Sequence, residues 1–298
     1  MIAAPMERIG QVVCAVGESP LWCARRGLWF WVDITARAIW RFDPGSGEVR
    51  EYRAPQMVAC LALDGDGDLI AGMEDGVYSV QLDDSSCLAH ARQLTAPLAS
   101  MAGMRFNDGR CDRQGRFWSG TMALDAALAP GCGKLYRYGA ADGLSEPVVE
   151  NLVVQNGLAW SPDGRTMYLS DSHTSRQLVW AFDYDSGSGM PSRRRVFIDM
   201  NDHPGRPDGA AIDVDGCYWT CANDAGMIHR FTPAGRLDRS IAVPMAKPSM
   251  CSFGGADMRT LLVTSISTGA PAGDALAGAV FLLEPGIEGM PEQRFGGK

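Results

Sequence analysis

The stretch Asn156-Gly157-Leu158-Ala159-Trp160-Ser161-Pro162-Asp163-Gly164-Arg165-Thr166 joins a polar residue and an apolar run to a glycine-containing turn. The same order recurs where Asp208-Gly209-Ala210-Ala211-Ile212 leads into Asp215-Gly216. The glycines of five such turns fall at positions 27, 67, 115, 164 and 216, in steps of 40, 48, 49 and 52 residues. Internal repeats of this length are typical of solenoids and propellers.

A second pattern follows each turn, as a short strand rich in aromatic or alternating residues. Lys134-Leu135-Tyr136-Arg137-Tyr138 and Leu178-Val179-Trp180-Ala181-Phe182 are two examples. Six repeats of both patterns in the same order, with almost no helical periodicity, predict a six-bladed β-propeller of four-stranded antiparallel blades. We expect residues 1–298 to form this single domain, and a first strand at about 8–13 to pair into the last blade and close the ring.

The composition narrows the classes of partner. The chain has 298 residues and 46% hydrophobic content, enough for a sizeable core, and a net charge of −8 argues against nucleic acid or an anionic membrane as main partner. No apolar run approaches the roughly 20 residues of a membrane span, and no secretory signal is visible. Nine scattered cysteines without a CxxC motif predict reduced thiols in a cytoplasmic protein, and a closed propeller is compatible with a monomer.

Four polar residues each open an apolar run at the same phase of the repeat, namely Glu18, Asn107, Asn156 and Asp208. The first residues of the innermost strands of a propeller converge at one mouth of the central channel, so we expect a site there. Carboxylate and amide oxygens without thiol or imidazole suit Ca²⁺, Mg²⁺ or Mn²⁺, and Zn²⁺ and Fe²⁺ also accept them. The alternative is that Asn-Gly and Asp-Gly form ordinary hairpin turns and that Glu18 is a solvated surface acid.

Several further motifs occur in a fixed order over about residues 10–265. They are Gly17-Glu18-Ser19-Pro20-Leu21-Trp22, Arg105-Phe106-Asn107-Asp108-Gly109, Gly115-Arg116-Phe117-Trp118-Ser119-Gly120-Thr121-Met122, Asn156-Gly157-Leu158-Ala159-Trp160-Ser161, Pro207-Asp208-Gly209 and Cys251-Ser252-Phe253-Gly254-Gly255. In these motifs and their order the chain resembles the senescence marker protein, gluconolactonase and luciferin-regenerating enzyme family, which includes regucalcin.

The resemblance implies a six-bladed propeller that hydrolyses sugar lactones with one divalent metal ion. Glu18, Asn156 and Asp208 would hold the metal, which would polarise the lactone carbonyl. Asp208, with one oxygen free, would take a proton from the attacking water as general base. No serine nucleophile is suggested, since none lies in a GxSxG motif.

The resemblance also implies a substrate-binding set. Arg105 and Asn107 would bind the sugar hydroxyls or the ring oxygen, and Arg105 could also help neutralise developing charge. Asp125 lies shortly after the Gly-Thr-Met segment, where the family often has an acid, although a solvated loop acid is the alternative. His203 is interpreted as a proton donor or an exposed loop residue, and His173 as a substrate contact.

Three functions remain open on these residues. The first is a metal-dependent aldonolactonase that converts a sugar lactone into its aldonic acid. A phosphotriesterase or arylesterase on the same site is the second, and a Ca²⁺-binding regulatory protein without catalysis is the third. Arg105 beside Asn107 favours the lactonase, because an ion buffer needs no cationic side chain for a substrate.

Overall fold

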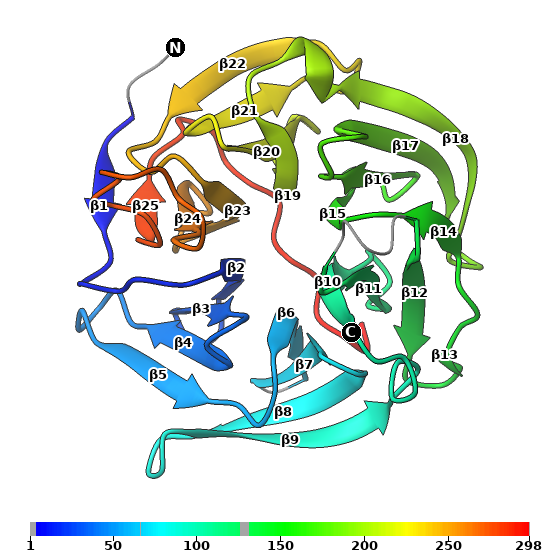
Figure 1. The fold of residues 1–298 in the computed structure, drawn as a ribbon, viewed down its shortest axis with the longest axis horizontal. Coiled ribbons are helices and arrows are strands. Elements are labelled where there is room, and N and C mark those ends of the chain that lie inside the picture. Colours follow the sequence, from blue (N-terminus) through cyan, green and yellow to red (C-terminus); the bar gives the residue numbers. More distant parts are fainter. Residues whose placement is uncertain (1–3, 66, 126–130, 298) are drawn as a thin grey trace.

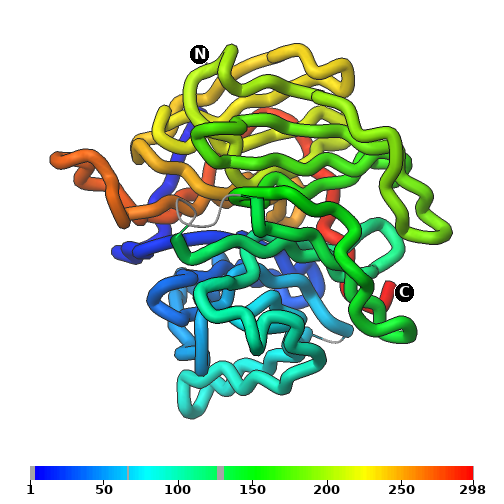
Figure 2. The backbone as a smooth tube through the Cα atoms, turned by 45° about the vertical axis from the view of Figure 1, so that its right-hand side comes forward, coloured from blue at the N-terminus to red at the C-terminus, as the bar shows by residue number. Residues whose placement is uncertain are grey.

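The structure is a computed structural model, which describes residues 4–65, 67–125 and 131–297. In this part of the chain the regular structure is β-strand, apart from one 3-10 helix, η1 (Met200–Asp202). Figure 1 shows the strands arranged around a central axis, and the colours run round the ring from blue to red. The oblique view of Figure 2 shows the loop over residues 266–280, in orange, projecting from this ring. The fold is therefore an all-β propeller.

The strands run antiparallel to their neighbours within each group, with a single parallel contact described below. In chain order they are β1 (Met6–Arg8), β2 (Gly17–Cys23), β3 (Leu28–Asp33), β4 (Ala38–Phe42), β5 (Val49–Arg53), β6 (Val58–Asp64), β7 (Asp68–Met73), β8 (Val77–Asp83), β9 (Leu88–Thr95), β10 (Met104–Cys111), β11 (Phe117–Ala123), β12 (Gly133–Gly139), β13 (Gly143–Leu144), β14 (Val149–Leu152), β15 (Gln155–Trp160), β16 (Thr166–Asp171), β17 (Leu178–Asp185), β18 (Met190–Asp199), β19 (Arg206–Ile212), β20 (Tyr218–Asn223), β21 (Met227–Phe231), β22 (Leu237–Ala242), β23 (Pro248–Gly254), β24 (Thr260–Ser265) and β25 (Phe281–Leu283).

The prediction of six separate four-stranded blades is wrong. Hydrogen bonds join the strands of the described residues into five sheets, and only three of these have four strands. These are β15–β18, β19–β22, and β23–β25 together with β1. The other two have eight strands, β2–β9, and five strands, β10–β14.

Contacts at Asp84 explain the eight-stranded sheet. The outer strands β5 and β9 meet in parallel at one point, where Arg53 pairs with Leu88. Asp84, in the turn before β9, accepts a hydrogen bond from Arg41 Nη1 at 2.7 Å and one from the Tyr52 hydroxyl. These contacts hold β4 and β5 against the turn between β8 and β9, so two neighbouring groups of four strands become one sheet.

Proline explains the five-stranded sheet. The fourth position of this sheet is divided between β13 and β14, which both pair with β12. Pro147 lies between these two strands and has no backbone N–H to donate to a sheet ladder. The outer edge is therefore interrupted where a continuous strand was expected.

The N-terminal strand closes the ring. β1 pairs antiparallel with β25, with Glu7 opposite Leu282, and Ile9 continues the contact by donating to Val280 O at 2.9 Å. The predicted pairing of the first strand with the last group is confirmed, although this strand covers residues 6–8 instead of 8–13. Pairing β1 with the C-terminal strand covers an edge that would otherwise be open to other chains.

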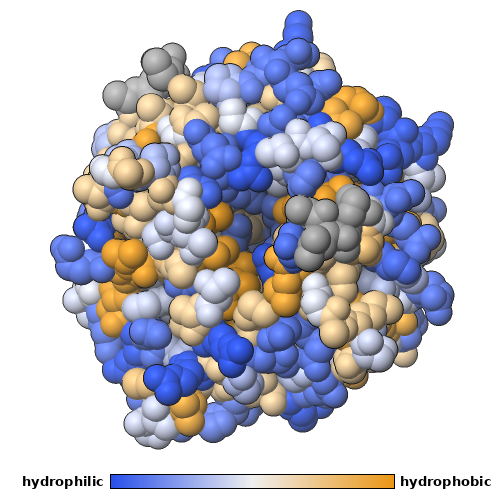
Figure 3. All heavy atoms as spheres, viewed as in Figure 1, coloured by the Kyte–Doolittle hydropathy of each residue, from blue (hydrophilic) through white to orange (hydrophobic). Residues whose placement is uncertain are grey.

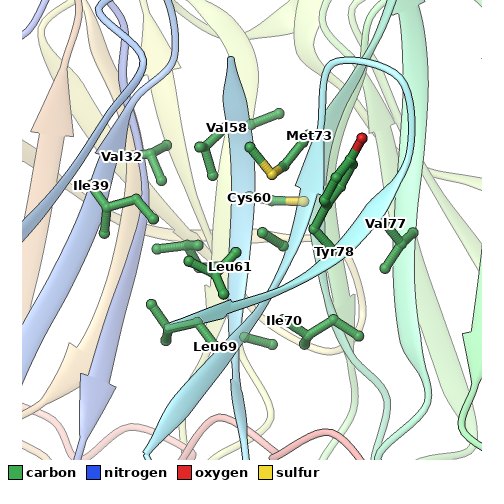
Figure 4. Packing of buried hydrophobic residues seen from close by; sticks show 14 of the residues in the cluster. Val32, Ile39, Val58, Cys60, Leu61, Leu69, Ile70, Met73, Val77 and Tyr78 are labelled. Atoms are coloured by element: carbon green, nitrogen blue, oxygen red, sulfur yellow. The ribbon is translucent and has the colours of Figure 1, made fainter. Parts of the chain in front are cut away.

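Apolar side chains fill the space between neighbouring groups of strands. Figure 4 shows Val32 and Ile39, from β3 and β4, facing Val58 and Leu61 of β6, and all four are buried. Trp29, Trp31, Trp118 and Trp219 are also fully buried in the wider core. This close packing fixes the angle between adjacent groups and so the positions of the innermost strands.

Buried aspartates fix the glycine-containing turns that the sequence repeats. Asp213 follows β19, is fully buried, and its Oδ1 accepts from the backbone N–H groups of Asp215 and Cys217 at 3.0 and 2.9 Å. Its Oδ2 accepts from Trp219 Nε1 and from Arg230 Nε, both at 2.7 Å. One carboxylate thus ties a turn, a core tryptophan and a buried guanidinium together.

The C-terminal segment, residues 284–297, crosses the end of the ring at which the innermost strands finish. Met290 and Phe295 donate backbone hydrogen bonds to Ile212 O at 2.9 Å and Leu63 O at 2.8 Å. Glu292 lies 3.2 Å from the buried Arg110 Nη1, on the innermost strand β10. Figure 1 shows this segment, in red, passing the centre of the ring.

The state of the cysteines and the search for membrane-spanning helices concern the predictions made from composition. The nine cysteines are free thiols, of which seven are buried. In the residues that the structure describes, no helix is long and apolar enough to span a membrane.

Candidate active site

The innermost strands share an irregularity at the position of the predicted site residues. In Figure 1 these strands surround the ring axis, and each shifts its register against its neighbour within its first few residues. A bulge changes the direction of the side chains next to it. The shifts lie between Glu18 and Leu21, Val58 and Cys60, Phe106 and Gly109, Asn156 and Ala159, Pro207 and Ala210, and Pro248 and Cys251.

Asn156-Gly157 lies within β15 and is not a hairpin turn. Gly157 has φ +59°, and a Cβ there would come within 2.3 Å of the Tyr218 hydroxyl and 2.5 Å of Ser170 Oγ. Only glycine fits both the backbone angle and the space. The Asn-Gly pair therefore shapes the bulge that presents Asn156.

A chain of hydrogen bonds connects Arg105, Asn107 and Asn156. Arg105 Nη1 donates to Asn107 Oδ1 at 2.6 Å and to Phe106 O at 2.8 Å. Asn107 Nδ2 then donates to Asn156 Oδ1 at 3.1 Å and to Gln155 O at 2.6 Å. Three of the predicted site residues, from two adjacent innermost strands, are thus in direct contact.

Two further polar side chains hold Asn156 and Asp208. Asn156 Nδ2 donates to Ser172 Oγ at 2.7 Å, and the Ser172 hydroxyl donates to Pro207 O, one residue before Asp208. Asn223 Nδ2 donates to Asp208 Oδ2 at 2.6 Å. Ser172 and Asn223 follow or end the second strands β16 and β20, which return to the same end of the ring as the starts of the innermost strands.

Burial and like charges oppose ionisation of the two predicted carboxylate ligands. Glu18 and Asp208 are only 8% and 5% exposed. Burial raises the pKa of the Glu18 carboxyl well above its usual value, and the charges of Asp208 and Asp108 raise it further. Burial likewise raises the pKa of Asp208, while the hydrogen bond from Asn223 lowers it. The carboxyls of Glu18 and Asp208 therefore interact where water is largely excluded.

The guanidinium of Arg105 balances part of this negative charge. Burial lowers the pKa of Arg105 to about 10, and the neighbouring charge of Glu18 raises it. Arg105 thus stays protonated at neutral pH, and its charge in turn lowers the pKa of Glu18. The structure brings Glu18, Arg105, Asn107, Asn156 and Asp208 into one polar cluster.

Three further residues were predicted from the sequence, namely Asp125, His203 and His173. Asp125 follows β11 and is exposed, next to residues 126–130, which are outside the described part of the chain. His203 packs its ring on Phe231, with centroids 5.1 Å apart. His173 Nδ1 lies 2.8 Å from Ser175 Oγ. The assigned roles of these three residues stay predictions.

Sequence reasoning missed three members of the cluster. Asp108 is buried beside Asn107, and its Oδ2 accepts from the Leu158 N–H at 3.0 Å. Ser172 and Asn223 were not among the residues predicted from the sequence to bind metal or substrate. The signal for both was their place at or just after the end of a second strand, since these ends return to the site.

The cluster offers oxygen ligands for a metal ion but few acidic side chains. Among the described residues, no group of three or more His, Cys, Asp or Glu side chains is placed to hold a metal ion. The predicted set has only two carboxylates, Glu18 and Asp208, and takes its third oxygen from the amide of Asn156.

Figure 3, in the same view as Figure 1, shows a hollow over the centre of the ring.

Comparison with known proteins identifies the family. The family model for the SMP-30/gluconolactonase/LRE-like region matches residues 16–267. The chain is 34% identical to 6-deoxy-6-sulfogluconolactonase of Pseudomonas putida, over 95% of each chain, and 32% identical to regucalcin of Gallus gallus, over 100% of each. The solved structure of a calcium-binding protein, regucalcin, from Agrobacterium tumefaciens superposes with a TM-score of 0.89 and 25% identity, over 99% of this chain and 98% of that one. The chain therefore belongs to the SMP-30/gluconolactonase/LRE-like family.

Proposed function

We propose that the protein is a metal-dependent aldonolactonase, which hydrolyses a sugar lactone to its aldonic acid. The observation that carries the proposal is the buried cluster in which Glu18 and Asp208 interact beside Arg105 and the amide of Asn156. A relative named as a sulfogluconolactonase supports this substrate class. Asp125 is kept as a further proposed substrate contact on the basis of the family pattern alone.

The cluster fits a divalent cation held by Glu18, Asn156 and Asp208. Burial and mutual repulsion make it unfavourable for both carboxyls to be ionised. A cation between them would offset this repulsion and stabilise the ionised forms. Their oxygens and the amide oxygen are hard ligands, which suit Ca²⁺, Mg²⁺ or Mn²⁺, and also Zn²⁺ or Fe²⁺. A bound cation would supply Lewis-acid polarisation of the lactone carbonyl.

Asp208 is the proposed general base. Its Oδ2 is held by Asn223 at 2.6 Å, which fixes the plane of the carboxylate. Among the described residues no hydrogen bond engages Oδ1, so this oxygen has lone pairs to accept a proton from water. Lactones are activated esters, so water activated by a positioned base can attack the carbonyl without a serine nucleophile.

Arg105 and Asn107 are the proposed substrate-binding pair. Both hydrogens of Asn107 Nδ2 are used within the cluster, so a sugar hydroxyl would donate to Asn107 Oδ1. Within the described part of the chain, the hydrogen bonds of Arg105 use only Nη1. Its Nε and Nη2 groups would therefore donate to the sugar or the ring oxygen.

A Ca²⁺-binding role without catalysis is the second proposal, because a regucalcin is among the relatives and the solved regucalcin structure is that of a calcium-binding protein. Phosphotriester or aryl ester hydrolysis at the same cluster is the remaining alternative. These alternatives differ from the lactonase in what they do to a sugar lactone, which makes the distinction measurable.

Chelation should abolish the reaction. We expect the protein as purified to accelerate acid release from 1,4- and 1,5-aldonolactones in a weakly buffered indicator assay. Treatment with EDTA should reduce the rate to the spontaneous rate, and one added divalent cation should restore it and raise the thermal midpoint of unfolding. Phosphotriesters and aryl esters serve as comparison substrates.

Two outcomes would count against the lactonase. Full activity in protein shown by elemental analysis to be metal-free would remove the cation from the proposal. If cations bind and stabilise the protein but no lactone is opened faster than in buffer, the non-catalytic Ca²⁺-binding role is favoured instead.

A further inference from the structure

The Ser172 hydroxyl connects two of the three proposed ligands. It accepts a hydrogen bond from Asn156 Nδ2 at 2.7 Å and donates to Pro207 O, directly before Asp208. Ser172 is only 2% exposed, and its own backbone is fixed because its N–H donates to Val154 O at 2.9 Å. One side chain thus contacts the innermost strands β15 and β19 together.

Arg105 and the Pro207 carbonyl, the two ends of this series of hydrogen bonds, determine the direction of every bond between them. Arg105 can only donate, so Asn107 must present its Oδ1 to the guanidinium and its Nδ2 to Asn156 Oδ1. Asn156 Nδ2 then faces Ser172. At the other end the Pro207 carbonyl can only accept, so the Ser172 hydrogen points to it and its lone pair to Asn156.

Loss of the Ser172 hydroxyl would remove this constraint. Asn156 Nδ2 and Pro207 O would both lose a buried partner, and the amide of Asn156 would be held only by the hydrogen bond from Asn107 to its Oδ1. An amide held at only one of its two ends can tilt, which moves Oδ1, the atom that would bind the cation. The effect would reach Asp208 as well, through the backbone of Pro207.

We propose that Ser172 is a positioning residue, whose hydroxyl sets the amide of Asn156 and the backbone before Asp208 in the geometry that a divalent cation requires. The proposal rests on the proposed function, because it concerns the affinity of the same site. Groups that orient metal ligands typically change metal affinity about 10- to 100-fold when they are removed.

Ser170, on the strand β16 that Ser172 follows, offers a matched control. It lies two residues earlier, is fully buried, and its hydroxyl has no hydrogen-bond partner among the described residues. Removing that hydroxyl by Ser170→Ala deletes the same group from the same interior without breaking a contact to Asn156 or Pro207.

The test compares Ser172→Val with Ser172→Thr, which have the same shape and differ only in the hydroxyl. Titration of metal-free protein with Mn²⁺ alone, followed by calorimetry, gives the dissociation constant without any assay of activity. We expect Ser172→Val to raise it about 10- to 100-fold, and Ser172→Thr and Ser170→Ala to stay within about threefold of the unmodified protein.

The thermal midpoint of each metal-free variant separates positioning from general stability. A lower midpoint with unchanged Mn²⁺ affinity in Ser172→Val would overturn the proposal and leave the proposed function intact. If the unmodified protein binds neither Mn²⁺ nor Ca²⁺, both the cation site and this inference are wrong. Should Ser172→Val fail to fold, Ser172→Ala replaces it in the same comparison with Ser172→Thr.

Discussion

Replacing Asp208 with asparagine is expected to lower kcat/KM for an aldonolactone by about 10³-fold or more, since a general base alone typically contributes about 10²- to 10⁴-fold. Asparagine keeps the size of the side chain but cannot accept the proton from water at neutral pH. Its amide also lacks the charge that helps to hold a cation. Initial rates of acid release at saturating cation would measure the loss.

Asp183→Asn is the matched control for that experiment. Asp183 is also a strand aspartate with arginine partners, at 2.8 Å from Arg195 Nη1, but it lies on β17 in the outer part of its sheet. Its loss should leave kcat/KM within about twofold, because exposed ion pairs contribute little. Unchanged turnover in Asp208→Asn, with the cation still bound, would show that another group activates the water.

Replacing Asp213 with alanine is expected to lower the free energy of unfolding by about 3 kcal/mol or more. The substitution leaves the Trp219 indole N–H, two backbone N–H groups and the Arg230 guanidinium without a buried acceptor. Chemical denaturation followed by tryptophan fluorescence would measure the change, since Trp219 lies at the affected contact.

Asp215→Ala provides the comparison for Asp213. Asp215 also pairs with Arg230, at 2.8 Å from Nη2, but its side chain is 59% exposed. Water replaces an exposed acceptor at small cost, so we expect a change of at most about 1 kcal/mol. Equal losses for Asp213 and Asp215 would mean that burial of the carboxylate does not set its contribution.

The propeller class and the location of the site were accessible from sequence because both depend on local, repeated signals. Asn156 and Asp208 stand at the same phase before apolar runs, and a ring of strands brings equal phases together. In the structure Arg105, Asn107 and Asn156 are in contact. The position of Asn107 in the repeat, taken alone, groups it with the proposed metal ligands. In the structure Asn107 donates a hydrogen bond to Asn156, which is compatible with the proposed role in substrate binding.

The division into sheets was not accessible, because it depends on contacts between distant segments. The repeat predicts where strands begin, but it says nothing about Asp84 reaching Arg41 and Tyr52 from the next group of strands. The role of Ser172 could not be predicted for a similar reason. A serine after a strand is common, and only the fold places its hydroxyl between Asn156 and Pro207.

The C-terminal segment has a kinetic consequence. Residues 284–297 cross the end of the ring opposite the polar cluster, and Glu292 pairs there with Arg110. For the proposed lactonase, the lactone would then enter and the acid would leave at the end of the ring where the polar cluster lies. The acid and the lactone would then compete for the same site from the same side. Added aldonate should therefore raise the apparent KM for the lactone while kcat stays constant.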